Sequence, residues 1–146
     1  METQKNNTNI SPGQQAADNA GILSKDWSDR VILVVDDIQV NYLLIKAMLL
    51  KVKAKAIWAS DGLKAIEIVE SGGHIDAVLM DYNMPMMNGI EATIRIKEIN
   101  PGLPVVSQST FTDNVDFVRS AAPFDEYLSK PIHWNELIAK LELVMK

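Results

Sequence analysis

The apolar residues of this chain are grouped into five short runs separated by amphipathic segments. The runs lie at about residues 31–35, 53–59, 75–80, 105–109 and 124–129. The first is continuously apolar and β-branched, which is typical of a strand covered on both faces. Apolar residues at helical spacing predict helices at about 40–48, 62–71, 88–97, 113–121 and 131–145. The pattern therefore alternates strand and helix along the chain.

This alternation defines the expected fold class. Strands that alternate with helices form parallel sheets, because right-handed crossovers place the helices on both faces. We therefore expect an α/β fold of (βα)5 type, a doubly wound parallel five-stranded sheet in a three-layer sandwich.

Polar side chains stand where four of the predicted strands end. Asp36 and Asp37 follow the first strand, Asp81 follows the third, Ser109 ends the fourth and Lys130 follows the fifth. The carboxyl ends of parallel strands meet at one edge of the sheet, where sites are commonly built. Three crowded carboxylates repel one another, and a hard divalent cation such as Mg²⁺ is the usual remedy. The sequence therefore predicts one shared crevice.

Composition narrows the function classes. The formal net charge of −5 argues against a nucleic-acid surface, which needs a basic face. The chain has no cysteine, so it can hold neither disulfides nor thiolate-bound metals. It lacks an apolar stretch of the roughly 20 residues that a membrane span needs. Residues 1–28 are polar and predict a flexible tail or linker before a domain at 29–146. We expect a cytoplasmic location without direct membrane contact, or the cytoplasmic part of a membrane sensor kinase.

Four motifs together resemble the response-regulator receiver domain of two-component signalling. They are Val34-Val-Asp-Asp37, Met80-Asp-Tyr-Asn-Met-Pro-Met-Met-Asn-Gly89, Ser109 and Tyr127-Leu-Ser-Lys-Pro131. The chain is most similar to the C-terminal receivers of hybrid sensor histidine kinases. The resemblance implies a flavodoxin-like sandwich with strand order 2-1-3-4-5. A stand-alone receiver fits the sequence nearly as well.

The resemblance also implies the chemistry of the site. Asp81 would be the phosphoacceptor, taking a phosphoryl group from the phosphohistidine of a histidine kinase or phosphotransfer protein. Mg²⁺ would be held by Asp36, Asp37, Asp81 and the backbone carbonyl of Asn83. Such a domain phosphorylates and dephosphorylates itself and is not a classical enzyme on its own.

Two further residues would bind the transferred group. Lys130 would pair with Asp81 at rest and with a phosphoryl oxygen afterwards, and Ser109 would donate to another phosphoryl oxygen. The resemblance makes Ser109 and Tyr127 the switch residues. They would change the surface formed by the fourth helix, fifth strand and fifth helix, about residues 113–145. That surface is also a candidate for weak homodimerisation. The bond between Lys130 and Pro131 is expected to be cis.

The chain departs from the family pattern on the output side. Ser109 replaces the commoner threonine, Thr110 replaces a small alanine, and Pro123 stands where glycine is usual. The segment from Ser109 to Lys130 is also about one residue short. We therefore expect an irregular fourth helix region. Phe111 should position hydrolytic water poorly, which predicts a persistent acyl phosphate.

Three other classes compete with this hypothesis. A small phosphatase with an aspartyl nucleophile usually has an acid two residues after it, where this chain has Asn83. A flavodoxin-like redox protein needs a phosphate loop after the first strand, where the acidic pair would repel the phosphate of FMN. A non-phosphorylated pseudo-receiver would lack a member of the site, and none is missing here.

Overall fold

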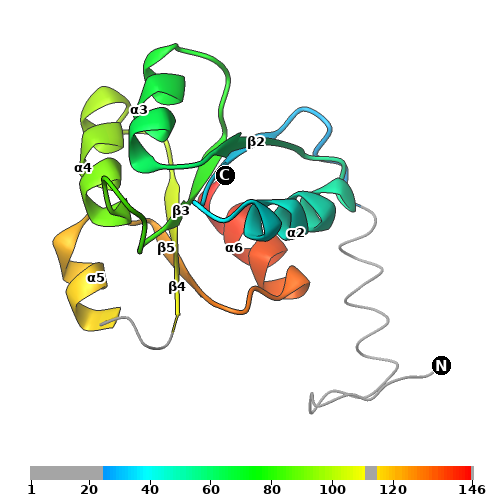
Figure 1. Cartoon of the computed structure of the whole chain (residues 1–146). Helices are drawn as coiled ribbons and strands as arrows, with labels where there is room; N and C mark the ends of the chain where they lie inside the picture. The colour runs from blue at the N-terminus through cyan, green and yellow to red at the C-terminus, as the bar shows by residue number, and fades with distance from the viewer. Residues whose placement is uncertain (1–24, 111–114, 146) are drawn as a thin grey trace.

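A five-stranded parallel sheet forms the centre of the molecule (Figure 1). The computed structural model describes residues 25–110 and 115–145. The strand order is β2-β1-β3-β4-β5, which confirms the predicted fold and topology. The strands are β1 (Val31–Val35), β2 (Lys55–Ala59), β3 (Ala77–Asp81), β4 (Val105–Ser109) and β5 (Glu126–Ser129).

The helices cover the two faces of this sheet, as Figure 1 shows. They are α2 (Gln39–Leu50), α3 (Gly62–Glu70), α4 (Gly89–Ile99), α5 (Val115–Ala121) and α6 (Trp134–Val144). Helices α3 and α4 pack on one face, and α2 and α6 pack on the other. Among the described residues, every helix falls short of the length and apolarity needed to cross a bilayer. The described chain is thus a three-layer sandwich.

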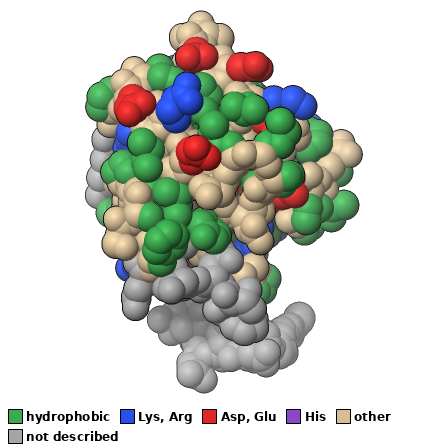
Figure 2. Space-filling model, turned by 60° about the vertical axis from the view of Figure 1, so that its left-hand side comes forward, with side chains coloured by type: hydrophobic (Ala, Val, Ile, Leu, Met, Phe, Trp, Pro, Cys, Tyr) green, Lys and Arg blue, Asp and Glu red, His purple; other side chains and the backbone are tan. Residues whose placement is uncertain are grey.

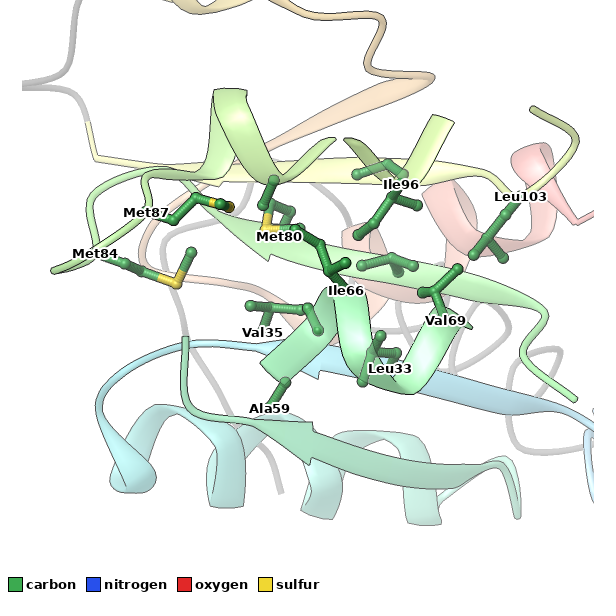
Figure 3. Packing of buried hydrophobic residues seen from close by; sticks show 14 of the residues in the cluster. Leu33, Val35, Ala59, Ile66, Val69, Met80, Met84, Met87, Ile96 and Leu103 are labelled. Atoms are coloured by element: carbon green, nitrogen blue, oxygen red, sulfur yellow. The ribbon is translucent and has the colours of Figure 1, made fainter. Parts of the chain in front are cut away.

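The central strands bury both of their faces. In β1, Leu33 and Val35 belong to the cluster beneath α3 and α4, and Ile32 and Val34 belong to the cluster beneath α2 and α6. Figure 3 shows the first cluster, with Ile66 of α3 lying against the sheet. This division follows from the two-residue repeat of a strand, which sends successive side chains to opposite faces. It explains why the central runs are continuously apolar.

Two helices begin at side-chain caps. The Asp61 carboxylate accepts a hydrogen bond from the Lys64 backbone N–H at 2.9 Å, and the Asn88 side chain accepts one from Glu91 at 3.0 Å. Such caps satisfy backbone donors that lack partners within the helix. A Cβ atom on Gly62 would lie 3.0 Å from the Ala92 Cβ, so this glycine lets α3 and α4 pack closely.

Helix α2 is apolar on its outer side as well as on its inner side. It buries Tyr42, Ile45 and Leu49. Val40, Leu43 and Leu44, which the periodicity singles out from the sequence, are 62%, 49% and 56% exposed. Because this helix is apolar nearly all round, its sequence pattern predicts a helix but does not specify which face is buried.

The segment before β1 contacts the domain from residue 25. The Trp27 backbone N–H donates to the Val52 carbonyl at 2.8 Å, and the indole packs against the cluster beneath α2 and α6. Lys25 forms an ion pair with Glu142 of α6 at 2.8 Å. The remainder of the predicted tail, residues 1–24, lies outside the described residues.

Candidate functional site

Three carboxylates meet where β1 and β3 end. Asp36 and Asp37 follow β1, and Asp81 is the last residue of β3, the strand paired with β1. One carboxylate oxygen from each of the three lies within 4.8 Å of the others. Asp36 is fully buried, Asp81 is 6% exposed and Asp37 is open to solvent. The sheet therefore brings together the acidic residues that the sequence indicated.

Asp36 is fixed by contacts on both its side chain and its backbone. Its carboxylate accepts hydrogen bonds from the Ile38 N–H at 2.9 Å and from the Asn41 amide at 3.4 Å. The indole N–H of Trp58 on β2 donates to the Asp36 carbonyl at 2.8 Å. Trp58 is a positioning residue that the sequence analysis missed, because nothing local to β2 indicates which group its indole reaches.

Lys130 lies between two of the carboxylates. Its ammonium is 3.1 Å from an oxygen of Asp81 and 3.5 Å from an oxygen of Asp36. The sequence predicted the Asp81 contact but not the Asp36 contact. The Lys130 backbone N–H donates to the Ser109 carbonyl at 2.8 Å, and the bond to Pro131 is cis, as expected. The ends of β4 and β5 thus position the ammonium over β1 and β3.

Burial and crowding perturb the titration of this cluster. Burial raises the pKa of the Asp81 carboxyl from 3.8 to about 6. Attraction by Lys130 lowers this pKa and repulsion by Asp36 and Asp37 raises it, so one cation does not compensate for burial and two neighbouring carboxylates. Burial also acts to lower the pKa of Lys130, but attraction by Asp81 and Asp36 outweighs it and places that pKa above the usual value.

The donor set fits a hard divalent cation. It consists of carboxylate oxygens, two of them on buried side chains and one on an exposed side chain, with access from solvent on the Asp37 side. Mg²⁺ prefers such oxygen ligands and keeps several waters, which an open side allows. Burial, which Lys130 offsets only in part, is the main reason that the pKa of Asp81 is raised, and a bound cation would lower this pKa. Asn83, the source of the predicted carbonyl ligand, is exposed in the loop after β3.

The start of α4 lies directly against the end of β3, which carries Asp81. The Gly89 N–H donates to the Tyr82 carbonyl at 2.9 Å. A Cβ atom on Gly89 would collide with the Asp81 carbonyl oxygen. Only glycine tolerates this approach of two backbones, which explains the Asn88-Gly89 pair at this point of the sequence.

The predicted switch residues occupy two neighbouring strands. Ser109 ends β4, is 9% exposed and pairs with Ser129 of β5. The ring of Tyr127 on β5 lies beneath the Arg119 guanidinium of α5, at 4.2 Å, and forms an edge contact with Phe124 at 6.0 Å. Phe111, on which the predicted slow hydrolysis depends, lies outside the described residues.

The face on the α4 and α5 side carries mixed charges. Figure 2 shows acidic, basic and apolar side chains interspersed there, without a continuous basic surface among its described residues. The distribution agrees with the acidic composition.

A family model and the curated relatives match the chain to one protein family. The family model described as the response regulator receiver domain matches residues 32–142. The autoinducer 1 sensor kinase/phosphatase LuxN of Vibrio harveyi is 34% identical over 106 residues, covering 73% of this chain and 12% of that protein. Two-component response regulator 24 of Arabidopsis thaliana is 31% identical over 112 residues, covering 75% and 79%. The chain therefore spans only a small part of its sensor-kinase relatives.

Solved structures agree with the sequence relatives. The receiver domain of a sensor histidine kinase from Pseudomonas aeruginosa, solved with magnesium coordinated in its active-site cleft, superposes with a TM-score of 0.73 at 28% identity, covering 80% of this chain and 97% of that one. A response regulator receiver domain protein from Clostridium thermocellum gives 0.71 at 27% identity, covering 80% and 94%. With the fold and the strand-end cluster, these matches show that the chain belongs to the response regulator receiver domain family of two-component signalling.

Proposed function

We propose that Asp81 accepts a phosphoryl group from a phosphohistidine in a Mg²⁺-dependent reaction. The observation that carries this proposal is the Lys130 ammonium lying 3.1 Å from Asp81 within a cluster of three carboxylates. Asp81 belongs to the one group of three or more candidate metal-ligating side chains found among the described residues. Its position in the cluster gives it both a cation partner and a route to solvent on the Asp37 side.

The proposed step forms one bond and breaks another. An oxygen of the Asp81 carboxylate attacks phosphorus, the bond from phosphorus to the imidazole nitrogen breaks, and the imidazole leaves with the bonding electron pair. The product is an acyl phosphate. Lys130 changes its partner from the Asp81 carboxylate to a phosphoryl oxygen, and the Ser109 hydroxyl donates to another. Mg²⁺ would offset charge on the phosphoryl oxygens. It would be held by Asp36, Asp37, Asp81 and the Asn83 carbonyl.

The charge added at Asp81 then changes the surface formed by α5, β5 and α6, which is the surface predicted from the sequence at about residues 113–145. Ser109 lies on β4, next to the strand that carries Tyr127. When Ser109 is drawn toward the phosphoryl group, the Tyr127 ring leaves its place beneath Arg119 and turns inward. The changed surface is where we place the downstream partner and weak homodimerisation. A new charge that biases an element with two states is the general basis of such switches.

The donor of the phosphoryl group is a histidine kinase or a phosphotransfer protein. The apolar outer side of α2, with Val40 and Leu43 about half exposed, lies beside Asp36 and offers the contact surface. We therefore propose that the domain lies in the cytoplasm, where it would meet such a phosphohistidine protein. We propose that the predicted tail or linker, residues 1–28, joins it to other parts of a signalling protein, with its last residues from Lys25 packed on the domain.

Mass spectrometry of the intact protein tests this proposal. The chain is incubated with acetyl phosphate and Mg²⁺, and the adduct of one phosphoryl group is measured against time. We expect an adduct that requires Mg²⁺, is lost in Asp81→Asn and is retained in Asp61→Asn. The control makes the same change of charge at a helix cap that asparagine also satisfies. An adduct that persists in Asp81→Asn, or that forms equally well in EDTA, would contradict the proposal.

A further inference from the structure

A cavity of about 400 Å³ lies between α2, the end of β4 and the segment after β5. It is beside the group of Asp36, Asp37, Asp81 and Lys130, called here the phosphorylation cluster after the function proposed for it. Its walls are largely apolar and include Leu44, Ile45 and Met48 of α2 and Ile132. This volume lies at the lower end of the range for small-molecule sites, which are also mostly apolar with few polar groups. The chemistry described for Asp81 does not use the cavity.

Gln108 of β4 lines this cavity and is fully buried. Neither the oxygen nor the nitrogen of its side-chain amide has a hydrogen-bond partner among the described residues. Gln108 and Val106 are two residues apart on β4 and therefore face the same side, where Val106 packs beneath α2 and α6. A buried amide without partners is costly, whereas leucine of similar size would avoid this cost. Such an exception needs a physical reason.

The surroundings favour an organic ligand over an ordered water. A buried water is held by two to four polar groups. The other polar residues lining the cavity are Asn41, Thr110 and Lys130. The Asn41 amide already donates to Asp36, the Lys130 ammonium is paired with Asp81 and Asp36, and Thr110 has an interaction of its own, so the wall left to face Gln108 is mainly hydrocarbon. An amphipathic molecule would instead bury its apolar part against α2 and pair both atoms of the Gln108 amide.

We propose that this cavity binds a small amphipathic molecule with an apolar body and a carboxamide-like end. The end would supply one donor and one acceptor, complementary to the oxygen and nitrogen of Gln108. The site is next to the phosphorylation cluster, because Gln108 pairs with Asp81 in the sheet and Lys130 also lines the cavity. Binding does not depend on phosphoryl transfer, so it survives in Asp81→Asn.

A matched pair of probes tests the complementarity. Benzamide has a donor and an acceptor on a planar ring, and acetophenone has the same shape but only the acceptor. Amide resonances of the ¹⁵N-labelled chain are titrated with each probe. We expect shifts at residues lining the cavity, with a dissociation constant for benzamide on the order of 1–10 mM for so small a molecule. Benzamide should bind about 3- to 10-fold more tightly than acetophenone.

Two variants complete the experiment. Gln108→Leu should abolish the preference for benzamide and raise the melting temperature by several degrees. Leu44→Trp, a change at a half-exposed wall residue, should block both probes while leaving Gln108 in place. It keeps the test decisive if Gln108→Leu fails to fold. Equal affinity for the two probes, benzamide binding that Leu44→Trp does not affect, or a water held by both amide atoms without any probe binding would overturn the proposal.

Discussion

Replacing Asp81 by asparagine should stabilise the protein in the absence of metal. The difference between a pKa of about 6 in the folded chain and 3.8 for the free carboxyl corresponds to about 3 kcal/mol against the charged form. The amide has nearly the same shape and no charge, so it removes the cost of burying a charge and, with it, the repulsion from Asp36 and Asp37. It also loses the attraction of Lys130, which the shifted pKa already includes. We expect a net gain of about 2–3 kcal/mol at pH 8.

The pH dependence follows from the sign of this shift. A carboxyl with a raised pKa in the folded state binds more protons folded than unfolded between about pH 4 and pH 6. Stability of the parent therefore falls as the pH rises through that window, and the full penalty is present above about pH 6. Asp81→Asn should have little advantage at pH 4 and its full advantage at pH 8.

Urea unfolding in EDTA at both pH values measures this difference, with Asp61→Asn as the control of equal charge change. In thermal unfolding the gain at pH 8 corresponds to about 5–10 °C for a domain of this size. Millimolar Mg²⁺ should narrow the gap, because it stabilises the parent by binding the folded carboxylates. If Asp81→Asn were no more stable than the parent at pH 8 in EDTA, the reasoning from burial and crowding would be refuted.

Three further substitutions test other parts of the site. Gly89→Ala should cost at least about 2 kcal/mol in urea unfolding and shift the backbone resonances around Asp81, because the added Cβ meets the Asp81 carbonyl; unchanged resonances would contradict the close approach. Lys130→Met should destabilise the metal-free chain by about 2 kcal/mol, since two carboxylates lose their cation, and Mg²⁺ should restore part of this loss. If the variant and the parent were equally stable in EDTA, this would count against the pairing of Lys130 with both carboxylates. Arg119→Ala should change the Tyr127 ring resonances at a cost of about 0.5 kcal/mol, because the guanidinium covers an exposed side of the ring; ring signals identical to the parent's would exclude the stacking in solution.

The sequence predicted those parts of the fold that depend on periodicity and caps. The apolar run at 31–35 became β1 with the same limits, and Asp61 and Asn88 cap α3 and α4 where the pattern placed helix starts. The strand-end cluster could also be predicted from the sequence, because parallel strands bring their carboxyl ends to one edge of the sheet whatever their packing. The order of the strands required the resemblance to the receiver family as well.

The remaining features depend on contacts between distant segments, which no local pattern contains. The indole of Trp58 on β2 reaches Asp36 at the end of the neighbouring strand β1, and Lys130 reaches Asp36 as well as Asp81. Gln108 lies in a short polar run, Ser107-Gln-Ser109, which gives no sign that its amide is buried without a partner. In α2, where polar positions are scarce, only packing decides that Tyr42 and Ile45 are buried.

The two glycines at the ends of α3 and α4 have a mechanical consequence. Gly89 brings the start of α4 against the Asp81 carbonyl, and Gly62 brings α3 against Ala92 of α4. At Gly89 the neighbours are backbone atoms of Asp81 and Tyr82, whereas at Gly62 they are the Cβ atom of Ala92 and the side chain of Met87. A movement of the Asp81 backbone should therefore act directly on the start of α4, and less directly on α3, where the Met87 side chain can adjust. The end of β3 that carries Asp81 thus has a direct backbone connection to α4, separate from the path that we propose through Ser109 and Tyr127.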